Sequence, residues 1–359
     1  MQNEELGMIN IERKTLILLV FIPILYTLLF GGLFSRNVLT EVPIIVCNID
    51  GGFESQKLIQ NLYDTPELKI VSVETNADDI ATLMLKNNSR GAVVIPKNYS
   101  KEIHMSGSIY IELVIDNTNR SVGGTVSKAV QTVITNQNSN FNLSTRMLYS
   151  PTGGYIDFFL ASLIMHSTQI AIVFAIAPTL CNSELRMQNA ELNFSKKLII
   201  IIKLLILFSM VEISVISICL SIGISFFDMI CRGNFIEIMI LNSAFIICMV
   251  AFAICIGVLI DEEYKALLTP LAYIMPSIMF ANVTWPRHSM DDFSLILSYI
   301  MPIGYAADDL RNLLIKGVAV DLQFHVTILL LMASIFFTIA LIGVKYNDSK
   351  CSARISTSD

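Results

Sequence analysis

Two charged residues, Lys203 and Glu212, lie inside the segment Leu198–Phe227, which is otherwise apolar or uncharged. If this segment crosses a membrane, Lys203 is near enough to one end for its side chain to reach the bilayer surface. Glu212 lies near the middle, where a carboxylate is costly to bury. The two residues are about half a turn apart around a helix, so they cannot pair on one face. Glu212 is therefore expected either to face an interior path or a helix partner, or to be a protonated or hydrogen-bonded structural residue.

The sequence gives no other signal for chemistry. It contains no G-x-x-x-x-G-K-[ST] loop and no glycine-rich fingerprint after a strand, so it lacks the usual means of binding ATP phosphates. No Ser-His-Asp or paired-carboxylate constellation stands out. The seven cysteines form no CxxC pair, and the four histidines share no metal-ligand spacing. We therefore expect no catalytic, cofactor or metal site in this chain.

The composition points to a membrane protein. Hydrophobic residues make up 54% of the 359 residues and charged residues only 15%, whereas soluble domains are about one quarter charged. These values argue against a soluble two-domain enzyme and exclude a disordered chain. The net charge of −6 argues against nucleic-acid binding, which favours a basic excess.

Six segments are long and apolar enough to cross a bilayer, which takes about 20 residues. They are Thr15–Phe34, Phe158–Cys181, Leu198–Phe227, Ile238–Ile260, Ala266–Val283 and Val326–Val344. The first could instead be a cleaved signal peptide, but it is long for one and no small-x-small cleavage site follows it. The pattern predicts an α-helical integral membrane protein with six transmembrane helices in a 1+5 arrangement.

The part after the fourth span is irregular. Pro270 and Pro276 interrupt the fifth span, and each removes a backbone donor. Residues 284–323 are too polar for a span, yet Phe293–Tyr305 is strongly apolar around Pro302. A short re-entrant hairpin explains this pattern, because irregular backbone at membrane depth must be buried in protein or line water. A surface helix at the outer interface is the alternative.

Basic residues beside the spans predict the orientation, since Lys and Arg stay on the cytoplasmic side. With the N-terminus inside, nine short-flank basic residues lie inside and four outside. The inner set is Arg13, Lys14, Arg186, Lys196, Lys197, Lys265, Lys345, Lys350 and Arg354, and the outer set is Arg232, Arg287, Arg311 and Lys316. Both termini are therefore expected in the cytoplasm.

The long polar interval after the first span predicts an inserted α/β extracytoplasmic domain. Strand-like stretches are Val42–Val46, Leu68–Val73, Gly91–Ile95 and Ile109–Ile115, and helix-like stretches are Phe53–Tyr63, Asp78–Lys86 and Gly123–Met147. Such alternation is typical of a small α/β domain. Its apolar faces suit an ordinary core, and a ligand site within it is the alternative.

The predicted organisation has four parts. Residues 1–34 form the cytoplasmic N-terminus and first span, 35–155 the extracytoplasmic domain, 156–346 the five-helix transmembrane domain, and 347–359 a cytoplasmic tail. The five-helix part includes a cytoplasmic loop, 182–197, and the outer re-entrant region, 284–323. The loop is short and mixed in charge, so it is either a solvated connector or a short helix that grips a cytoplasmic partner.

Three local motifs on this layout resemble a known family. Arg90–Pro96 followed by Tyr99-Ser100 is similar to a "G-x-hydrophobic-I-P-x-x-[FY]-S" stretch, and Asp116–Asn119 is similar to a "D-x-T-N" turn. Pro302-x-x-Tyr305 with Leu310-Arg311 and Lys316-Gly317 resembles a "P-x-x-Y … R … K-G" segment. In this order on a 1+5 layout they resemble the permease subunit of ABC-2 type transporters, in the branch with a large outer domain.

The resemblance implies a multi-pass protein of the bacterial cytoplasmic membrane that dimerises with a second permease copy or paralogue and recruits a cytoplasmic ABC ATPase. A membrane-fusion protein is a further candidate partner. The loop after the second span is then the coupling segment, with Glu184, Arg186 and Glu191, and the outer gate is formed by Pro286, Pro302, Tyr305 and Arg311. Glu212 would lie in the membrane interior.

Two departures from the family pattern limit these implications. Gln188-Asn189-Ala190 stands where the family has Gly-Thr, which bears on the detailed ATPase contact. Phe280–Pro286 lacks the usual "S-G", so the substrate is not taken over from well-known members.

The function expected from these observations is an ATP-driven exporter permease for hydrophobic or amphipathic compounds, drug-like or lipid-like. A non-transporting envelope scaffold or sensor is the alternative, but the predicted cytoplasmic parts are too short to signal alone. A membrane-embedded hydrolase would need paired catalytic groups at one depth, and only Glu212 is available.

Overall fold

The structure, a computed structural model, describes residues 13–35, 39–103, 105, 110–116, 120–137, 154–181, 194–282, 284–285 and 287–356. The chain divides into two compact units, one formed by residues 1–35 and 149–359 and the other by residues 36–148. The second unit is a few residues shorter at its C-terminal end than the predicted 35–155 domain. Each unit is described by itself below.

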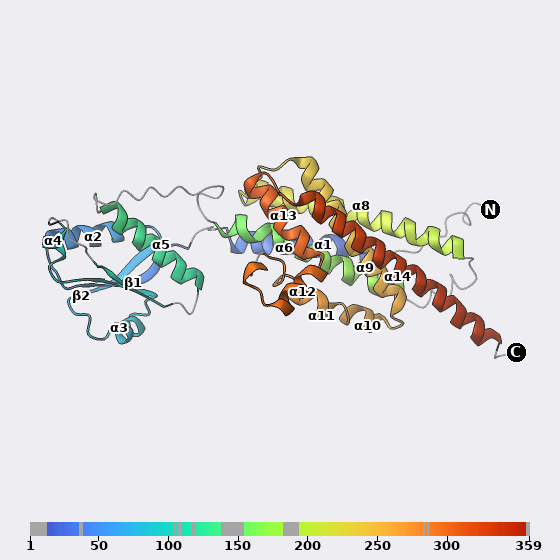
Figure 1. Ribbon diagram of the computed structural model, residues 1–359, viewed down its shortest axis with the longest axis horizontal. Coiled ribbons are helices and arrows are strands. Elements are labelled where there is room, and N and C mark those ends of the chain that lie inside the picture. The colour runs from blue at the N-terminus through green and yellow to red at the C-terminus, as the bar shows by residue number, and fades with distance from the viewer. Residues whose placement is uncertain are drawn as a thin grey trace. The chain divides into compact units, whose positions relative to one another are not determined.

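Unit 36–148 is built on a four-stranded sheet with the strand order β2-β1-β3-β4. Its strands are β1 (Val42–Asn48), β2 (Leu68–Glu74), β3 (Gly91–Ile95) and β4 (Glu112–Ile115), and its helices are α2 (Phe53–Tyr63), α3 (Ile80–Lys86), α4 (Tyr99–Glu102) and α5 (Arg120–Gln137). β1 runs parallel to both β2 and β3, and β4 is antiparallel to β3. The two central strands are almost fully apolar because helices cover both of their faces (Figure 1).

The topology explains which helix covers which face. The chain leaves β1 through α2 to reach β2 on one side, then returns through α3 to β3 on the other side of β1. Because crossovers between parallel strands are right-handed, this reversal puts the two helices on opposite faces. One core holds Leu58 of α2 and Val126 of α5 against Ile44, and the other holds Met84 of α3 against Ile45.

The loop that follows β1 is tied to the loop that follows β3. Asp50 accepts hydrogen bonds from the backbone N–H of Gly52 at 2.9 Å and from the hydroxyl and backbone N–H of Ser100. Gly51 turns the chain with φ of +64°, a conformation that favours glycine. This contact fixes the start of α2 at the carboxyl end of the sheet.

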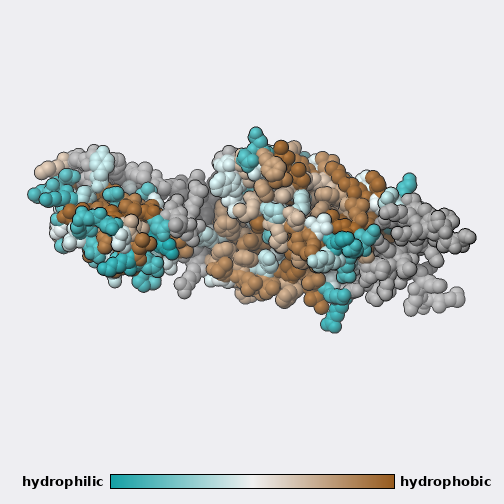
Figure 2. Space-filling view, turned by 90° about the horizontal axis from the view of Figure 1, so that it is seen from below, coloured by the Kyte–Doolittle hydropathy of each residue, from teal (hydrophilic) through white to brown (hydrophobic). Residues whose placement is uncertain are grey.

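The helical unit contains five helices, among the described residues, that are long and apolar enough to cross a membrane. They are α1 (Arg13–Leu33), η1 with α6 (Ile156–Cys181), α8 (Phe194–Phe226), α9 (Phe235–Leu259) and α14 (Leu322–Ser356). Most of the α6 and α9 spans is buried, whereas only a minority of α1, α8 and α14 is buried. The exposed face of this unit in Figure 2 is largely apolar, as expected for helices that meet lipid.

The segment predicted as the fifth span is not one continuous helix. It is broken into α10 (Glu263–Leu268) and α11 (Leu271–Ser277), with Pro270 at the N-cap of α11 and Pro276 inside it. Proline removes a backbone donor and ends the preceding helix, which is the physical reason for the break. The count of six spans therefore stays a prediction.

The chain continues through η2 (Arg287–Ser289), α12 (Asp292–Ile300) and α13 (Ile303–Lys316) before α14 begins. Pro302 is the N-cap of α13 and Gly317, with φ of +85°, is its C-cap. Contacts between helices place α14 along α9, α1 along α6, and α13 against both α6 and α9. These contacts hold α13 to the long helices, and α12 packs on α13.

The stability of unit 36–148 should depend on the charge of Asp50. Although burial acts to raise its pKa, the hydrogen bonds from Ser100 and Gly52 together lower the pKa below the usual value. A lowered pKa stabilises the fold above the unfolded value of about 3.9, and this contribution is lost as the pH falls through the folded pKa. Hydrogen exchange of the α2 amides in the full chain should therefore accelerate below about pH 4, after correction for intrinsic rates.

In Asp50→Asn the exchange of α2 should be faster at neutral pH and should change less between pH 5 and 2.5. Asp64→Asn, at the opposite end of α2, is the matched control and should keep the wild-type pH profile. An Asp50→Asn variant with the wild-type profile would contradict the role of this carboxylate.

Candidate functional site

The region between α11 and α13 is organised by the side chain of Arg287. Its Nε donates to Ser298 Oγ and its Nη2 donates to the carbonyl oxygen of Gly304, both at 2.9 Å. The guanidinium lies 5.1 Å from the ring centres of both Tyr299 and Tyr305, within the range of cation–π attraction. Arg287 therefore joins the loop after α11 to the end of α12 and the start of α13.

Other side chains in this region pair with backbone carbonyls that the short helices leave open. Ser298 donates to the carbonyl of Phe280, and Tyr305 donates to that of Tyr299, each at 2.8 Å. Tyr273 of α11 donates to the carbonyl of Ile300 at 2.9 Å. A helix end has up to four such unpaired carbonyls, and burying one without a donor is costly.

Gly304 is required by the same packing. A Cβ added there would lie 2.8 Å from the carbonyl oxygen of Ser298 and 3.0 Å from Arg287 Nη2. The close approach of two backbone segments leaves no room for a side chain, so the turn between α12 and α13 is held as one tight corner.

A second polar group extends from this corner along α13. Asp308 accepts a hydrogen bond from Asn282 Nδ2 at 2.9 Å and also pairs with Arg311. The guanidinium of Arg311 lies 4.9 Å from the ring centre of Phe158, at the start of the second span. The side chains of Asp308 and Arg311 are largely buried, so the pair links the loop after α11, α13 and η1 within the helical unit.

A third contact joins α13 to α14. His325 Nδ1 lies 2.7 Å from Asp309 Oδ2, and both side chains are mostly buried. The His325 ring also meets the edge of Tyr305, with ring centres 5.3 Å apart. Three of the four residues predicted for the outer gate thus lie in this network or at its corner, namely Pro302, Tyr305 and Arg311, whereas Pro286 lies outside the described residues.

Sequence reasoning did not identify Arg287, Asn282 or His325 as members of this network. Arg287 was used only as one of the basic residues beside the spans that predict orientation. Its position in the sequence does not show that its side chain contacts two tyrosines more than ten residues further along the chain. Aromatic residues on both sides of a helix break are a signal that could have drawn attention to the nearest cation.

Glu212 of α8 is fully buried, and neither of its carboxyl oxygens has a hydrogen-bond partner among the described residues. Lys203, in contrast, is exposed, as the half-turn separation between them predicts. Three more buried polar side chains lack partners among the described residues of the helical unit: Ser162 of α6, Ser209 of α8 and Asn242 of α9. Buried polar groups are normally paired, so this set marks polar sites whose partners are absent from the described single chain.

The second span carries a paired polar ladder in addition. Gln169 Nε2 lies 2.8 Å from His166 Nδ1 and 2.7 Å from Ser277 Oγ, and all three side chains are buried. Ser277 belongs to α11, just after Pro276, and also donates to the carbonyl of Ile274. The ladder fastens the broken helix to α6.

The residues predicted for coupling to an ATPase, Glu184, Arg186 and Glu191, lie outside the described residues. Within the described ranges, no three His, Cys, Asp or Glu side chains gather as a metal site would require. The polar contacts that the structure does describe position helices relative to one another.

Comparison with known proteins identifies the family to which the chain belongs. The model of the family described as ABC-2 family transporter protein matches residues 13–342. The chain is also 20% identical over 334 residues to "Probable multidrug ABC transporter permease YbhR" of Escherichia coli strain K12, with 90% of each chain covered, and equally to the protein of that name in Escherichia coli O157:H7. The match to the family model confirms the resemblance seen in the sequence motifs.

Arg287→Lys should loosen the corner between α12 and α13, because lysine keeps the charge but cannot make both hydrogen bonds or lie flat between two rings. A hydrogen bond of a charged group contributes about 1.5–3 kcal/mol, so amides of α12 and α13 should open about 10- to 100-fold more often. Hydrogen exchange of the reconstituted chain measures this opening.

The matched control is Arg232→Lys, which changes an exposed arginine of the same unit that donates one bond to the carbonyl of Ile315. It should leave the protection of α12 unchanged. Equal protection of α12 in wild type and Arg287→Lys would refute the organising role of Arg287.

Proposed function

Because the chain belongs to the ABC-2 family of transporter proteins, we propose that it forms one permease half of an ATP-driven exporter. Family membership implies a transmembrane permease that associates with an ABC ATPase and pairs into a dimer. The sequence lacks a phosphate-binding loop of its own, which supports ATP hydrolysis by a separate subunit. The observation that carries the proposal is the family match over residues 13–342.

The proposed cargo is a hydrophobic or amphipathic compound, drug-like or lipid-like. The relative from Escherichia coli is named a probable multidrug permease, and the match covers 90% of both chains. The helical unit also exposes large apolar side chains on α1, α8 and α14. A permease for such compounds would receive them from the bilayer rather than from water.

The proposed orientation puts both termini in the cytoplasm of a bacterial cell, with unit 36–148 outside the cytoplasmic membrane. The excess of basic residues on the inner flanks supports it. In this orientation the network around Arg287 lies at the outer end of the helical unit, and it supports an outer gate at Pro302, Tyr305 and Arg311. Residues 182–197 then face the ATPase.

The role proposed for Glu212 is to face a polar interior of the assembled transporter. Its complete burial without a described partner supports this role, because a lone carboxylate is costly in an apolar core. The competing explanation is that the carboxyl group is purely structural, which predicts that transport does not depend on it.

Coupling should depend on the charges of the loop 182–197. We expect the chain to co-purify with a cytoplasmic ATPase, and the ATP hydrolysis of the complex to fall on deletion of residues 183–192 or in the double variant Glu184→Gln, Arg186→Gln. The reason is that a loop of mixed charge binds a partner through ion pairs and charged hydrogen bonds. The rate of ATP hydrolysis by the complex in vesicles measures this coupling.

Lys57→Gln, which removes an exposed charge of α2 in unit 36–148, is the control and should preserve hydrolysis. Assembly is checked by size-exclusion chromatography, so that a loss of hydrolysis is not confused with a loss of the complex. Failure to bind any ATPase would count against the whole proposal, whereas normal hydrolysis in the double variant would exclude only the named residues.

Glu212→Gln should lower efflux of a fluorescent amphipathic dye from vesicles while leaving assembly intact, because glutamine fills the same space but cannot exchange a proton. Glu237→Gln, which changes a carboxylate in the first turn of α9, is the matched control and should transport normally. Full activity of Glu212→Gln would leave the structural explanation as the correct one.

A further inference from the structure

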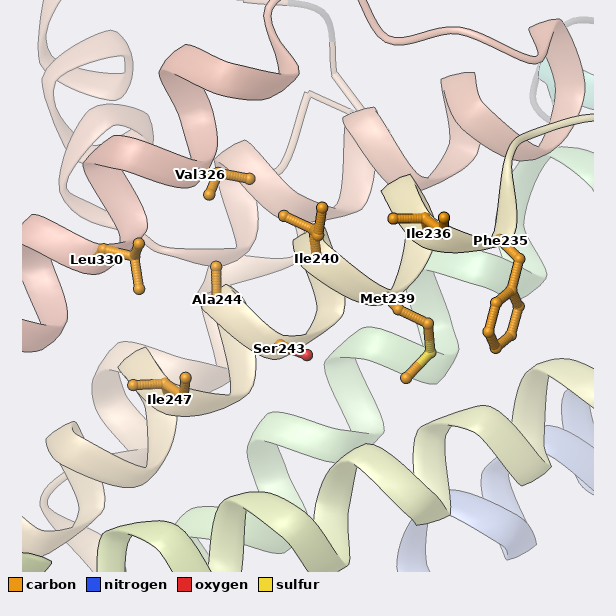
Figure 3. A pocket seen from close by; sticks show the side chains of 9 residues that line it. All are labelled: Phe235, Ile236, Met239, Ile240, Ser243, Ala244, Ile247, Val326 and Leu330. Carbon is orange, nitrogen blue, oxygen red and sulfur yellow. The ribbon is translucent and has the colours of Figure 1, made fainter.

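We propose that the groove between the N-terminal halves of α9 and α14 binds one acyl chain of a membrane phospholipid. The groove is lined by Phe235, Ile236, Met239, Ile240, Ser243, Ala244, Ile247, Val326 and Leu330, and eight of these nine side chains are apolar (Figure 3). This site is separate from the network around Arg287, and it does not depend on the transport proposal.

The position of the groove on two candidate membrane spans determines what surrounds it. Both α9 and α14 are long and apolar enough to cross a membrane. Ile236 is 64% exposed and Ile240 49% exposed, so no described part of the chain covers them. An apolar groove at membrane depth is filled either by hydrocarbon or by another apolar helix.

The size of the groove favours a single hydrocarbon chain. Its volume is about 400 Å³. The lining residues of α9 run from Phe235 to Ile247, about 18 Å along the helix axis. An α-helix of that length, about 10–12 Å wide with its side chains, fills about 1,400–2,000 Å³. The groove therefore admits a chain of methylene groups, and a helix could insert only a row of side chains.

The walls of the groove come from both helices. Figure 3 shows Val326 and Leu330 of α14 directed towards Ile240 and Ala244 of α9. Ala244 is small and buried, so it forms the floor of the groove. Ser243 is its single polar residue.

Two cationic side chains lie at the open end where a phosphate group would be. Arg232 is exposed and lies three residues before Phe235, and its guanidinium uses one of its five N–H donors on the carbonyl of Ile315. Its backbone oxygen would be 3.3 Å from a Cβ at Gly317, so the backbone of Arg232 runs beside the end of α13, where Lys316 is exposed. Glu237 in the first turn of α9 is the nearest opposing charge on that helix. A lipid phosphate next to Arg232 and Lys316 leaves its acyl chain to run along the groove.

The test uses the full chain in vesicles of phosphatidylethanolamine and phosphatidylglycerol that contain a phosphatidylglycerol with a photoreactive diazirine in one acyl chain. After irradiation, the label should map to residues 235–247 and 326–330. Native mass spectrometry of the purified chain should retain the mass of one phospholipid per chain.

Ser243→Phe and Ile240→Trp should each abolish the retained lipid and the label in the groove, because both put an aromatic ring into it. The matched control is Ile335→Trp, which adds the same ring at an exposed isoleucine of α14 outside the groove and should retain the lipid. The double variant Arg232→Gln, Lys316→Gln should retain less lipid, but the label should stay at the same residues.

Two outcomes would overturn the proposal. In the first, the label is spread evenly over the exposed faces of α1, α8 and α14 and does not change in Ser243→Phe. The helices would then contact bulk lipid only, and the groove would not be a specific site. A groove free of label in which Ile240→Cys forms a disulfide between two copies would mean that a second copy of this chain covers it.

Discussion

The helical unit depends on one constraint, that backbone carbonyls freed by a broken helix must find donors within the protein. The ends of the short helices α11 and α12 leave carbonyls without partners inside their own helix. The structure meets this demand with side chains: Ser298, Tyr305, Tyr273 and Arg287 donate to the carbonyls of Phe280, Tyr299, Ile300 and Gly304. The corner between α12 and α13 is specified by polar contacts, which have fixed directions, rather than by apolar packing alone.

The same contacts tie the corner to the spans. Arg311 reaches Phe158 at the start of the second span, His325 reaches Asp309 from α14, and Gln169 of α6 reaches Ser277 of α11. Each of these contacts joins a short helix to a long one. A rotation of one long helix would therefore be transmitted to the corner, which is a physical requirement for any gate that opens when two halves of a transporter move.

The layout of the chain was predictable because it rests on strong periodic signals. The strands and helices of unit 36–148 follow from alternating apolar runs and turn residues, and the predicted β1 start at Val42 and α2 bounds Phe53–Tyr63 agree with the structure. The partners of Arg287 were not predictable, since they lie on helices whose packing is decided by proline breaks and not by spacing. The prolines predicted that the fifth span would be irregular. They did not predict which side chains would pair with the backbone groups at the breaks.

Asn242 and Ser243 show how one helix can serve two environments. They are adjacent on α9 and therefore point about 100° apart. Asn242 is fully buried with its amide unpartnered among the described residues, whereas Ser243 lies in the groove beside α14. Because α9 packs against α6 and α8 on its buried side, a lipid chain in the groove and a polar partner at Asn242 would bear on the same rigid element from two sides. The groove and the unpartnered amide of Asn242 therefore lie on different faces of one helix, which its packing on α6, α8 and α14 already holds in place.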